Sequence, residues 1–205
     1  MIRSLRTALI LFVCLSAITG IVYPVLVTGL AYLVFPYQAH GSLLKVRGKV
    51  VGSKLIGQNF TAPEFFWGRP SATSPMPYNA AASNASSLGP DNPTLMEHVV
   101  KRVSYLKKMD PQERGKRVPV DLVTSSFSGL DPDISPASAQ YQEARVAQAG
   151  GLPVSQIRVL VRENTHYPLL GFLGEPVVNV LELNLALHQA YDIRKSRQPT
   201  PPMKS

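Results

Sequence analysis

Charged residues are absent from one long stretch near the N-terminus. No Asp, Glu, Lys or Arg occurs between residues 7 and 44, and within that stretch residues 8–35 are almost wholly apolar. As a helix, residues 8–35 would extend for roughly 40 Å, which exceeds the ~30 Å hydrocarbon core of a bilayer. The pattern predicts a cytoplasmic N-terminus at residues 1–7, one transmembrane helix over 8–35, a single α/β domain over 36–193 and a disordered, basic, Pro-rich tail over 194–205.

The apolar segment is longer than a cleaved signal peptide requires. Such peptides have an apolar region of ~7–15 residues and a small-x-small cleavage site, whereas residues 31–35 here are mostly bulky. We therefore expect the helix to remain as an anchor in the lipid bilayer. Arg3 and Arg6 precede it, so the positive-inside rule predicts a cytoplasmic N-terminus and an extracytoplasmic domain. The basic residues at 45–49 follow the helix and weaken this argument, but they lie further from it.

Small or helix-perturbing residues recur every four positions along the predicted span, at Ser16, Gly20, Pro24 and Thr28. Faces of this kind let a second helix approach closely in lipid, so they predict a partner-facing stripe. Pro24 is expected to kink the helix. The alternative is that Gly and Pro are simply frequent in membrane helices.

Composition narrows the class of the remaining chain. About 170 residues are enough for one domain. The net charge of +8 comes mostly from Arg3, Arg6 and four basic residues at the C-terminal end, and no basic stripe interleaved with aromatics is present, so nucleic acid is not an expected partner. The single cysteine, Cys14, lies within the apolar span, which excludes a disulfide framework and a thiolate zinc site.

The rest of the chain reads as a mixed α/β domain. Residues 45–53 alternate as short strands with a turn at Gly48–Lys49, and residues 58–93 form a long loop whose aromatic residues argue for order. Helices are expected from Asn92–Pro93 to before Pro111, from Ser135–Pro136 to Gly150, and from Ser155 as a cap. A short strand is expected over 118–124. Residues 179–193 suit a helix better than a strand because of their length and basic end.

No catalytic or metal centre is evident. The four histidines are scattered without metal-ligand spacing. Residues 52–57 have the two glycines of a phosphate-binding loop, but Gln58 and Asn59 stand where Lys and Ser or Thr are needed. Ser126, Ser128 and Asp131 lack the Gly-x-Ser-x-Gly elbow of a hydrolase. Catalysis, metals and an intrinsic cofactor are therefore not expected.

Two segments rich in mostly uncharged turn-forming residues stand out instead. Residues 67–71 (Trp-Gly-Arg-Pro-Ser) place the fork of Arg69 beside an indole, and residues 126–132 end with Asp131 before a proline. Two interpretations stay open. These segments fix turns of the fold, or they form a polar docking surface on which Arg69 and Asp131 are the anchors.

Together these segments resemble one family, the C subunit of the Kdp potassium-transporting P-type ATPase. The resemblance extends in order over nearly the whole chain and leaves out only the tail. The matching segments are 19–24, 41–44, 52–60, 66–73, 76–79, 118–126, 128–132, 134–136, 145–147 and 174–187. Two positions depart from the family pattern: Ser87 replaces the usual Asn of a Gly-rich turn, and Phe127 replaces a small residue.

The resemblance implies a fold, a function and partners. It implies a non-catalytic accessory subunit of an ATP-driven, high-affinity potassium uptake complex in the bacterial inner membrane, with hydrolysis in another subunit and K⁺ handled by the complex. The implied partners are a channel-like subunit, a P-type ATPase subunit and a small single-span subunit. Nine residues in the matching motifs are candidates for docking a partner or for forming turns: Gln58, Trp67, Arg69, Ser71, Ser128, Asp131, Asn179, Glu182 and Asn184.

The resemblance also implies a catalytic chaperone that raises the ATP affinity of the ATPase subunit, with ATP binding of its own. A domain outside the membrane does not meet cytosolic ATP, so this implication competes with the predicted topology. A domain on the outer face could instead brace the channel-like subunit. The alternatives from other classes are a membrane-anchored periplasmic enzyme or binding protein unrelated to transport, and a nucleotide-binding regulator.

Overall fold

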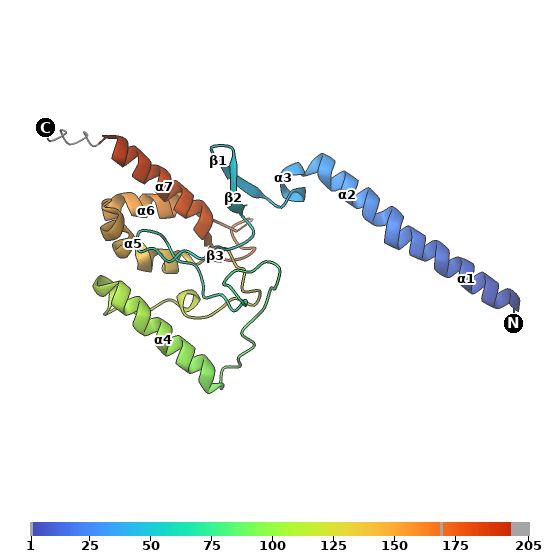
Figure 1. The fold of residues 1–205 in the computed structure, drawn as a ribbon, viewed down its shortest axis with the longest axis horizontal. Coiled ribbons are helices and arrows are strands. Elements are labelled where there is room, and N and C mark those ends of the chain that lie inside the picture. The colour runs from blue at the N-terminus through green and yellow to red at the C-terminus, as the bar shows by residue number, and fades with distance from the viewer. Residues whose placement is uncertain (1, 169, 198–205) are drawn as a thin grey trace. The chain divides into compact units, whose positions relative to one another are not determined.

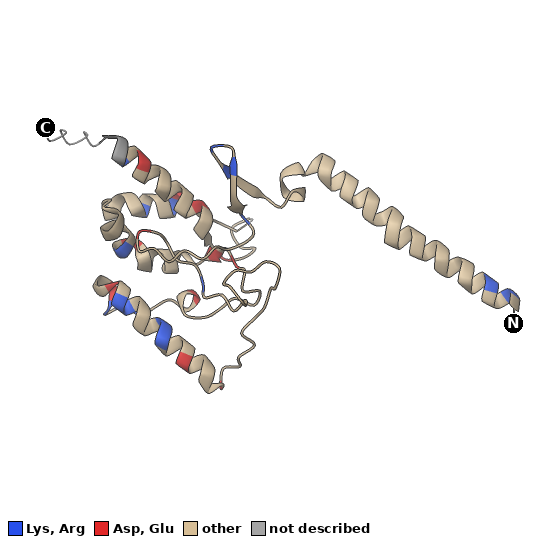
Figure 2. Cartoon of the chain, in the orientation of Figure 1, with Lys and Arg blue, Asp and Glu red and all other residues tan. Residues whose placement is uncertain are grey.

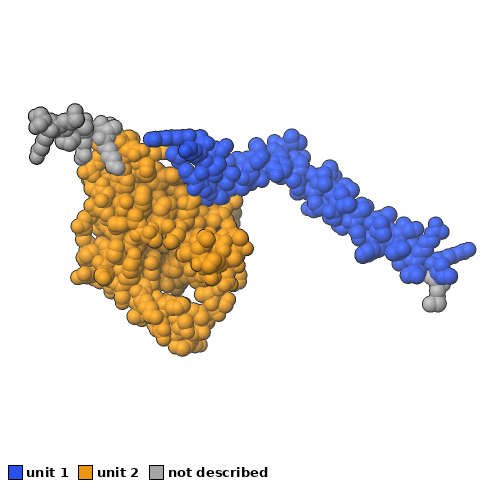
Figure 3. Space-filling view, viewed as in Figure 1, with its two compact units in different colours: residues 1–53 blue, residues 54–205 orange. Residues whose placement is uncertain are grey.

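The computed structural model describes residues 2–168 and 170–197, and the chain divides into two compact units, Met1–Ser53 and Lys54–Ser205 (Figure 3). The first unit begins with a continuous helix made of α1 (Ile2–Ala17), the π-helical segment η1 (Ile18–Val22) and α2 (Tyr23–Val34) (Figure 1). At 33 residues it extends for roughly 50 Å, and it is long and apolar enough to cross a membrane. Its charges lie only near its N-terminal end (Figure 2).

The π-helical segment lies immediately before Pro24. Proline has no backbone N–H, so the carbonyl four residues earlier, at Gly20, loses its α-helical donor. The chain adapts over η1 with a wider turn, in which the N–H of Tyr23 donates to the carbonyl of Ile18, five residues back. The disturbance expected at Pro24 is therefore present, and it takes the form of a π-helical turn.

The first unit ends in a hairpin. The one-turn helix α3 (Pro36–Ala39) follows α2, and β1 (Leu43–Val46) pairs antiparallel with β2 (Lys49–Ser53). The predicted hairpin is confirmed, although its first strand begins two residues earlier than expected. The predicted turn at Gly48–Lys49 was wrong by one residue, because Lys49 already pairs with Val46 as part of β2. Arg47 and Gly48 make the turn, with φ of 50° and 80°, the left-handed values that tight hairpin turns use.

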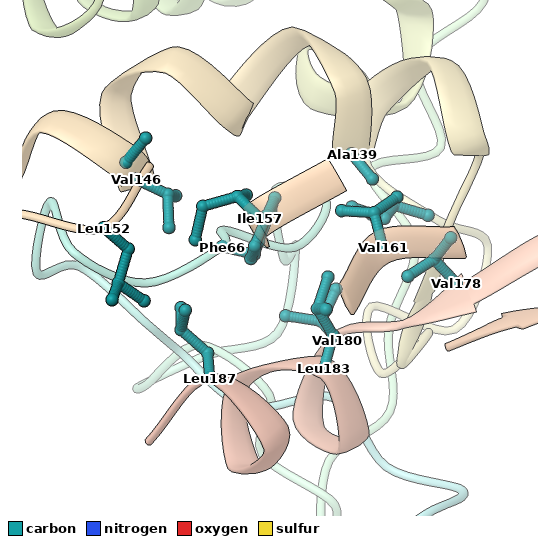
Figure 4. Packing of buried hydrophobic residues seen from close by; sticks show 12 residues of the cluster. Phe66, Ala139, Val146, Leu152, Ile157, Val161, Val178, Val180, Leu183 and Leu187 are labelled. Carbon is teal, nitrogen blue, oxygen red and sulfur yellow. The ribbon is translucent and has the colours of Figure 1, made fainter. Parts of the chain in front are cut away.

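The second unit packs helices around a small antiparallel sheet. The sheet has the order β3-β5-β4, from β3 (Asp133–Ile134), β5 (Val177–Asn179) and β4 (Thr165–His166). Three helices, α5 (Pro136–Gly150), α6 (Val154–Glu163) and α7 (Val180–Arg197), converge on one apolar cluster (Figure 4). Its buried members are Phe66, Ile134, Ala139, Val146, Ala147, Leu152, Ile157, Val161, Val178, Val180, Leu183 and Leu187.

Local signals located most helices correctly. The Asn92 side chain caps α4 (Pro93–Met109) by accepting from the N–H of Thr94, and the Ser135 side chain caps α5 by accepting from the N–H of Ser138. Helix α5 ends at Gly151, whose φ of 65° suits glycine. The helical interpretation of residues 179–193 is confirmed by α7, which begins at Val180. This helix continues to Arg197, so the prediction of a disordered tail was wrong for residues 194–197. Of the predicted tail, residues 198–205 lie outside the described residues.

Two local predictions were wrong. Helix α6 begins at Val154 behind Pro153, without a side-chain cap, so Ser155 lies inside the helix. Residues 118–124 do not form a strand, because the 3₁₀ turn η3 (Val120–Leu122) places Leu122 in a second apolar cluster, with Trp67, Leu106 and Tyr141. A short apolar run fits a buried turn as well as a strand. A second 3₁₀ turn, η2 (Pro111–Glu113), follows α4.

The long loop is ordered, as its aromatic residues predicted. Residues 54–92, all of them described, contain no helix or strand, yet Phe66 is fully buried and Trp67 is 2% exposed. These two residues contribute to different apolar clusters. The loop is therefore part of the core, and its buried backbone needs hydrogen-bond partners from outside regular structure.

Candidate functional site

Two side-chain amides supply hydrogen-bond partners for the buried backbone of the long loop, residues 54–92. Gln142 of α5 accepts from the N–H of Trp67 at 2.8 Å and donates to its carbonyl at 3.0 Å. Asn184 of α7 does the same for Phe66, at 2.8 Å and 2.9 Å. Both amides are at most 2% exposed. They satisfy two consecutive backbone units as a neighbouring strand would, and we call this arrangement the amide clasp. Asn184 therefore holds the loop inside the fold.

Arg145 reinforces the clasp from the next turn of α5. Its guanidinium lies 3.7 Å from the centre of the Trp67 ring, donates to the carbonyl of Phe65 at 3.0 Å, and donates to Gln142 at 2.6 Å. Burial lowers the pKa of Arg145 to about 10, although the charge of Asp110 acts in the opposite direction. The group stays charged at neutral pH because aromatic, carbonyl and amide partners surround it.

The two turn segments singled out in the sequence lie against each other. Arg69 pairs with Asp131 at 3.2 Å and donates to the carbonyl of Ser125 at 3.4 Å. Ser71 donates its hydroxyl to the carbonyl of Gly129 at 2.7 Å, and Ser128 accepts at its own hydroxyl from the N–H of Leu130. These contacts favour the interpretation that the segments close turns of the fold. Whether they also dock a partner stays a prediction.

Tyr78 locks this region and explains two glycines. Its hydroxyl donates to the carbonyl of Arg69 at 2.6 Å, and burial together with the charge of Asp131 raises its pKa to about 12, so the donor proton is retained. A Cβ at Gly57 would lie 2.3 Å from the Tyr78 ring, and a Cβ at Gly68 would lie 2.6 Å from its hydroxyl. Only glycine allows this close approach without displacing the ring.

Asn179 and Glu182 fasten the beginning of the second unit. The Asn179 amide donates to the carbonyl of Lys54 at 3.0 Å and to Asp133 at 2.9 Å, and its oxygen accepts from the N–H of Glu182. The Glu182 carboxylate pairs with Lys54 at 3.0 Å and with His166 at 2.9 Å. Burial by itself would raise the pKa of Glu182, but the hydrogen bonds from Lys54 and His166 outweigh it and lower the pKa.

A small basic and aromatic cleft opens between the loop and α4. It has a volume of about 190 Å³. Arg102 of α4 lies 5.4 Å from the centre of the Tyr105 ring, which stacks on Trp67. The Nε of Arg69 is buried and has no hydrogen-bond partner among the described residues. The lining residues are Gln58, Asn59, Phe60, Thr61, Trp67, Gly68, Arg69, Pro70, Ser71, Pro77, Tyr78, Arg102 and Tyr105.

The cleft unites some of the predicted site residues and separates others. Gln58, Trp67, Arg69 and Ser71 line it. Asp131 and Ser128 support its rim from the facing turn, while Asn179, Glu182 and Asn184 act elsewhere in the fold. The described residues contain no group of three His, Cys, Asp or Glu side chains placed to bind a metal ion.

Sequence reasoning missed several residues that build this region: Gln142, Arg145, Tyr78, Arg102 and Tyr105. One signal for the first two was available. Gln142 and Arg145 are three positions apart on a helix, and Ala139 and Val146, at helical spacing from them, are buried. A polar pair on an inward-facing stripe indicates a buried network. For Tyr78 and the α4 residues, no local pattern indicates which loop they meet.

The departures from the family pattern lie on surface turns. Ser87 is exposed with a φ of 50°, a left-handed conformation that Asn tolerates better than Ser. Phe127 is 93% exposed.

In the N-terminal helix, the π-helical segment improves the alignment of the small-residue stripe. In an α-helix each residue turns by about 100°, so four-residue steps from Ser16 to Thr28 would drift by about 120°. A π-helical turn holds about 4.4 residues, and over η1 it reduces that drift to about 50°. A Cβ at Gly20 would meet no atom within 4 Å in the isolated chain.

These features define the class of protein: a mixed α/β domain that follows a single helix suited to membrane anchoring. The family model described as "K+-transporting ATPase, c chain", named KdpC, matches residues 5–189. The potassium-transporting ATPase KdpC subunit of Ralstonia nicotianae is 58% identical to this chain, over 89% of this chain and 89% of the relative. The protein of the same name from Variovorax paradoxus is 60% identical, over 89% of this chain and 94% of the relative. The Sorangium cellulosum protein of that name is 56% identical over 93% of this chain and all of its own length. The chain therefore belongs to the KdpC family, whose members are subunits of potassium-transporting ATPases. This is the family that the sequence motifs resemble.

The amide clasp makes a specific stability prediction. Asn184→Leu keeps the branching and the number of heavy atoms of the side chain but leaves the buried N–H and carbonyl of Phe66 unpaired, so we expect it to lower the free energy of unfolding by about 2–4 kcal/mol. Gln189→Leu is the matched control, because Gln189 is an exposed residue of the same helix; it should change stability by no more than about 0.5 kcal/mol. Urea unfolding of the detergent-solubilised chain, followed by emission of the single tryptophan, measures both. An equal change in unfolding free energy for Asn184→Leu and Gln189→Leu would show that the amide clasp does not stabilise the fold.

The Glu182 contacts predict an acid-dependent loss of stability. Because the folded-state pKa of Glu182 is lowered, its contribution is fully present above the ordinary pKa and is lost as pH falls through the folded value. Between about pH 5 and pH 3 the free energy of unfolding of the unmodified chain should therefore fall more steeply than that of Glu182→Gln. The exposed Glu175→Gln should behave like the unmodified chain. Parallel pH profiles for all three proteins would show that the carboxylate contributes nothing.

Proposed function

We propose that this chain is a non-catalytic accessory subunit that assembles and stabilises a potassium-transporting ATPase. The chain belongs to a family of such subunits, and the residues that stand out in its sequence are committed to one another inside the fold. Hydrolysis then resides in the P-type ATPase subunit, and K⁺ passes through the channel-like subunit. The observation that carries this proposal is the small-residue face of the N-terminal helix, aligned by η1 and open to a neighbour at Gly20.

In this proposal the helix spans the bacterial inner membrane with its N-terminus in the cytoplasm. Arg3 and Arg6 precede the helix, which supports that orientation. The domain from Lys54 onward is then extracytoplasmic and braces the channel-like subunit. The small single-span subunit completes the complex.

The cleft supports docking of a partner side chain more than binding of a free nucleotide. Pockets for small molecules and cofactors usually hold about 300–1,000 Å³, and the cleft holds about 190 Å³. Its two arginines suit a carboxylate, since guanidinium groups bind that group through paired hydrogen bonds. An acidic side chain of the channel-like subunit is therefore the ligand we propose for the cleft. The chaperone role, with ATP binding by this chain, stays a prediction from the resemblance.

Substitution within the helix tests assembly. Gly20→Leu should block close approach of a partner helix while the isolated helix keeps its structure, because nothing in the chain lies near a Cβ at that position. We expect recovery of the other subunits with a tagged chain, in a detergent pull-down, to fall severalfold. The matched control is Gly29→Leu, because Gly29 is also open and points about 140° away from Gly20. Full recovery of the complex with Gly20→Leu would show that the small-residue stripe does not contact a partner helix.

Labelling in oriented vesicles tests location and the ATP role together. A photoreactive ATP analogue, added to right-side-out or inverted membrane vesicles that contain the complex, should leave this chain unlabelled from the cytosolic side. That result is expected because the proposed domain is exported and is separated from cytosolic nucleotide. Specific labelling of this chain only in inverted vesicles would reverse the orientation and support the nucleotide-binding role. Labelling of the ATPase subunit serves as the positive control.

A further inference from the structure

An exposed apolar loop joins strands β4 and β5 in the second unit. The strands pair antiparallel, with Thr165 opposite Val178 and His166 opposite Val177, so β4 and β5 form a hairpin. Tyr167, Leu170, Phe172 and Leu173 are 56–73% exposed. No charged residue lies between His166 and Glu175. We call the described residues of this connection, 167–168 and 170–174, the β4–β5 loop.

The concentration of exposed apolar side chains in this loop requires an explanation. Single exposed apolar residues are common on protein surfaces, but several large ones within eight residues indicate a binding surface. The fold gains nothing from them, because they contribute to neither apolar cluster of the domain. Gly171 and Gly174, with φ of 79° and 120°, shape the turn that displays them.

The root of the loop is fastened to the first residue of the domain. His166, the last residue of β4, contacts Glu182 at 2.9 Å, and Glu182 contacts Lys54 at 3.0 Å. Asn179, at the end of β5, holds the carbonyl of Lys54. The β4–β5 loop therefore emerges beside the point where the chain enters the domain, and residues 35–53 alone connect that point to the apolar helix.

The connecting segment carries charge of one sign. Lys45, Arg47 and Lys49 lie between the helix and the domain, and Lys54 is the first residue of the domain. The first acidic residue of the chain is Glu64. Basic residues that follow a membrane span are attracted to anionic lipid headgroups. A segment held at the headgroups would keep the beginning of the domain, and the loop beside it, near the bilayer surface on whichever side the domain lies.

We propose that the β4–β5 loop inserts Tyr167, Leu170, Phe172 and Leu173 into the interfacial region of the bilayer, as a second membrane contact beside the transmembrane helix. Tyrosine suits this region because its ring is apolar and its hydroxyl remains hydrated. Phe and Leu supply the apolar area that favours insertion. The contact gives the domain a point of attachment to the membrane of its own, in addition to the transmembrane helix.

Two tryptophan variants of the full chain test this proposal. Phe172→Trp places a reporter in the loop, and Phe127→Trp is the matched control, because Phe127 is 93% exposed on the turn at residues 126–129. Both carry the same buried Trp67 background. The chains are reconstituted into phosphatidylethanolamine–phosphatidylglycerol vesicles, with and without bromine on the acyl chains, both alone and with the other subunits. Circular dichroism checks that the variants keep the native fold.

We expect bromine to quench the Phe172→Trp reporter and shift its emission to the blue, and to leave the Phe127→Trp reporter unchanged. Absence of quenching at position 172, both alone and in the complex, would overturn the proposal. Equal quenching of both reporters would also overturn it, because contact would then be unspecific. A blue shift at position 172 that occurs only with the other subunits and without quenching by bromine would overturn the proposal, because it would show that the loop binds a protein subunit instead of lipid. None of these results depends on the outcome of the Gly20→Leu or vesicle-labelling experiments.

Discussion

The amide clasp is the interaction on which the domain depends. A loop of nearly forty residues lies largely outside regular structure, yet it delivers Phe66 and Trp67 into the core. A buried backbone unit without a hydrogen-bond partner is strongly unfavourable. Gln142 and Asn184 remove that penalty at two consecutive residues, from two different helices. The apolar clusters on either side can therefore form around a segment that has no strand neighbour.

The clasp also connects the core to the cleft. Arg145 bonds to Gln142 and covers the Trp67 ring, and that ring stacks on Tyr105 of α4. The position of the cleft wall therefore depends on the same loop residues that the clasp holds. On the other side, Tyr78 and the Arg69–Asp131 pair fix the rim. The docking surface proposed for this KdpC-family subunit is thus rigid because the fold and the surface share side chains.

Much of the candidate site was visible in the sequence as residue types, but their roles were not. Trp67, Arg69, Ser71 and Asp131 stood out because turn chemistry concentrates around them, and they do meet in space. Asn179, Glu182 and Asn184 came from the family resemblance, and the structure assigns them to different contacts. Arg102 and Tyr105 gave no signal, because a solvent-facing and a cleft-facing residue on an amphipathic helix have the same local pattern. The partner of each residue is set by packing between segments far apart in the chain.

The features that depend on neighbouring residues could be predicted from the sequence. The uncharged apolar run, the side chains that cap α4 and α5, and the glycine that ends α5 act within a few positions, so the anchor helix and most domain helices were predictable. Packing between distant segments makes residues 118–124 a buried turn and brings residues 58–93 into the core. It also pairs Phe66 with Asn184, a contact across 118 positions. These outcomes depend on which distant group satisfies a buried backbone or fills a space, and no local pattern contains that information.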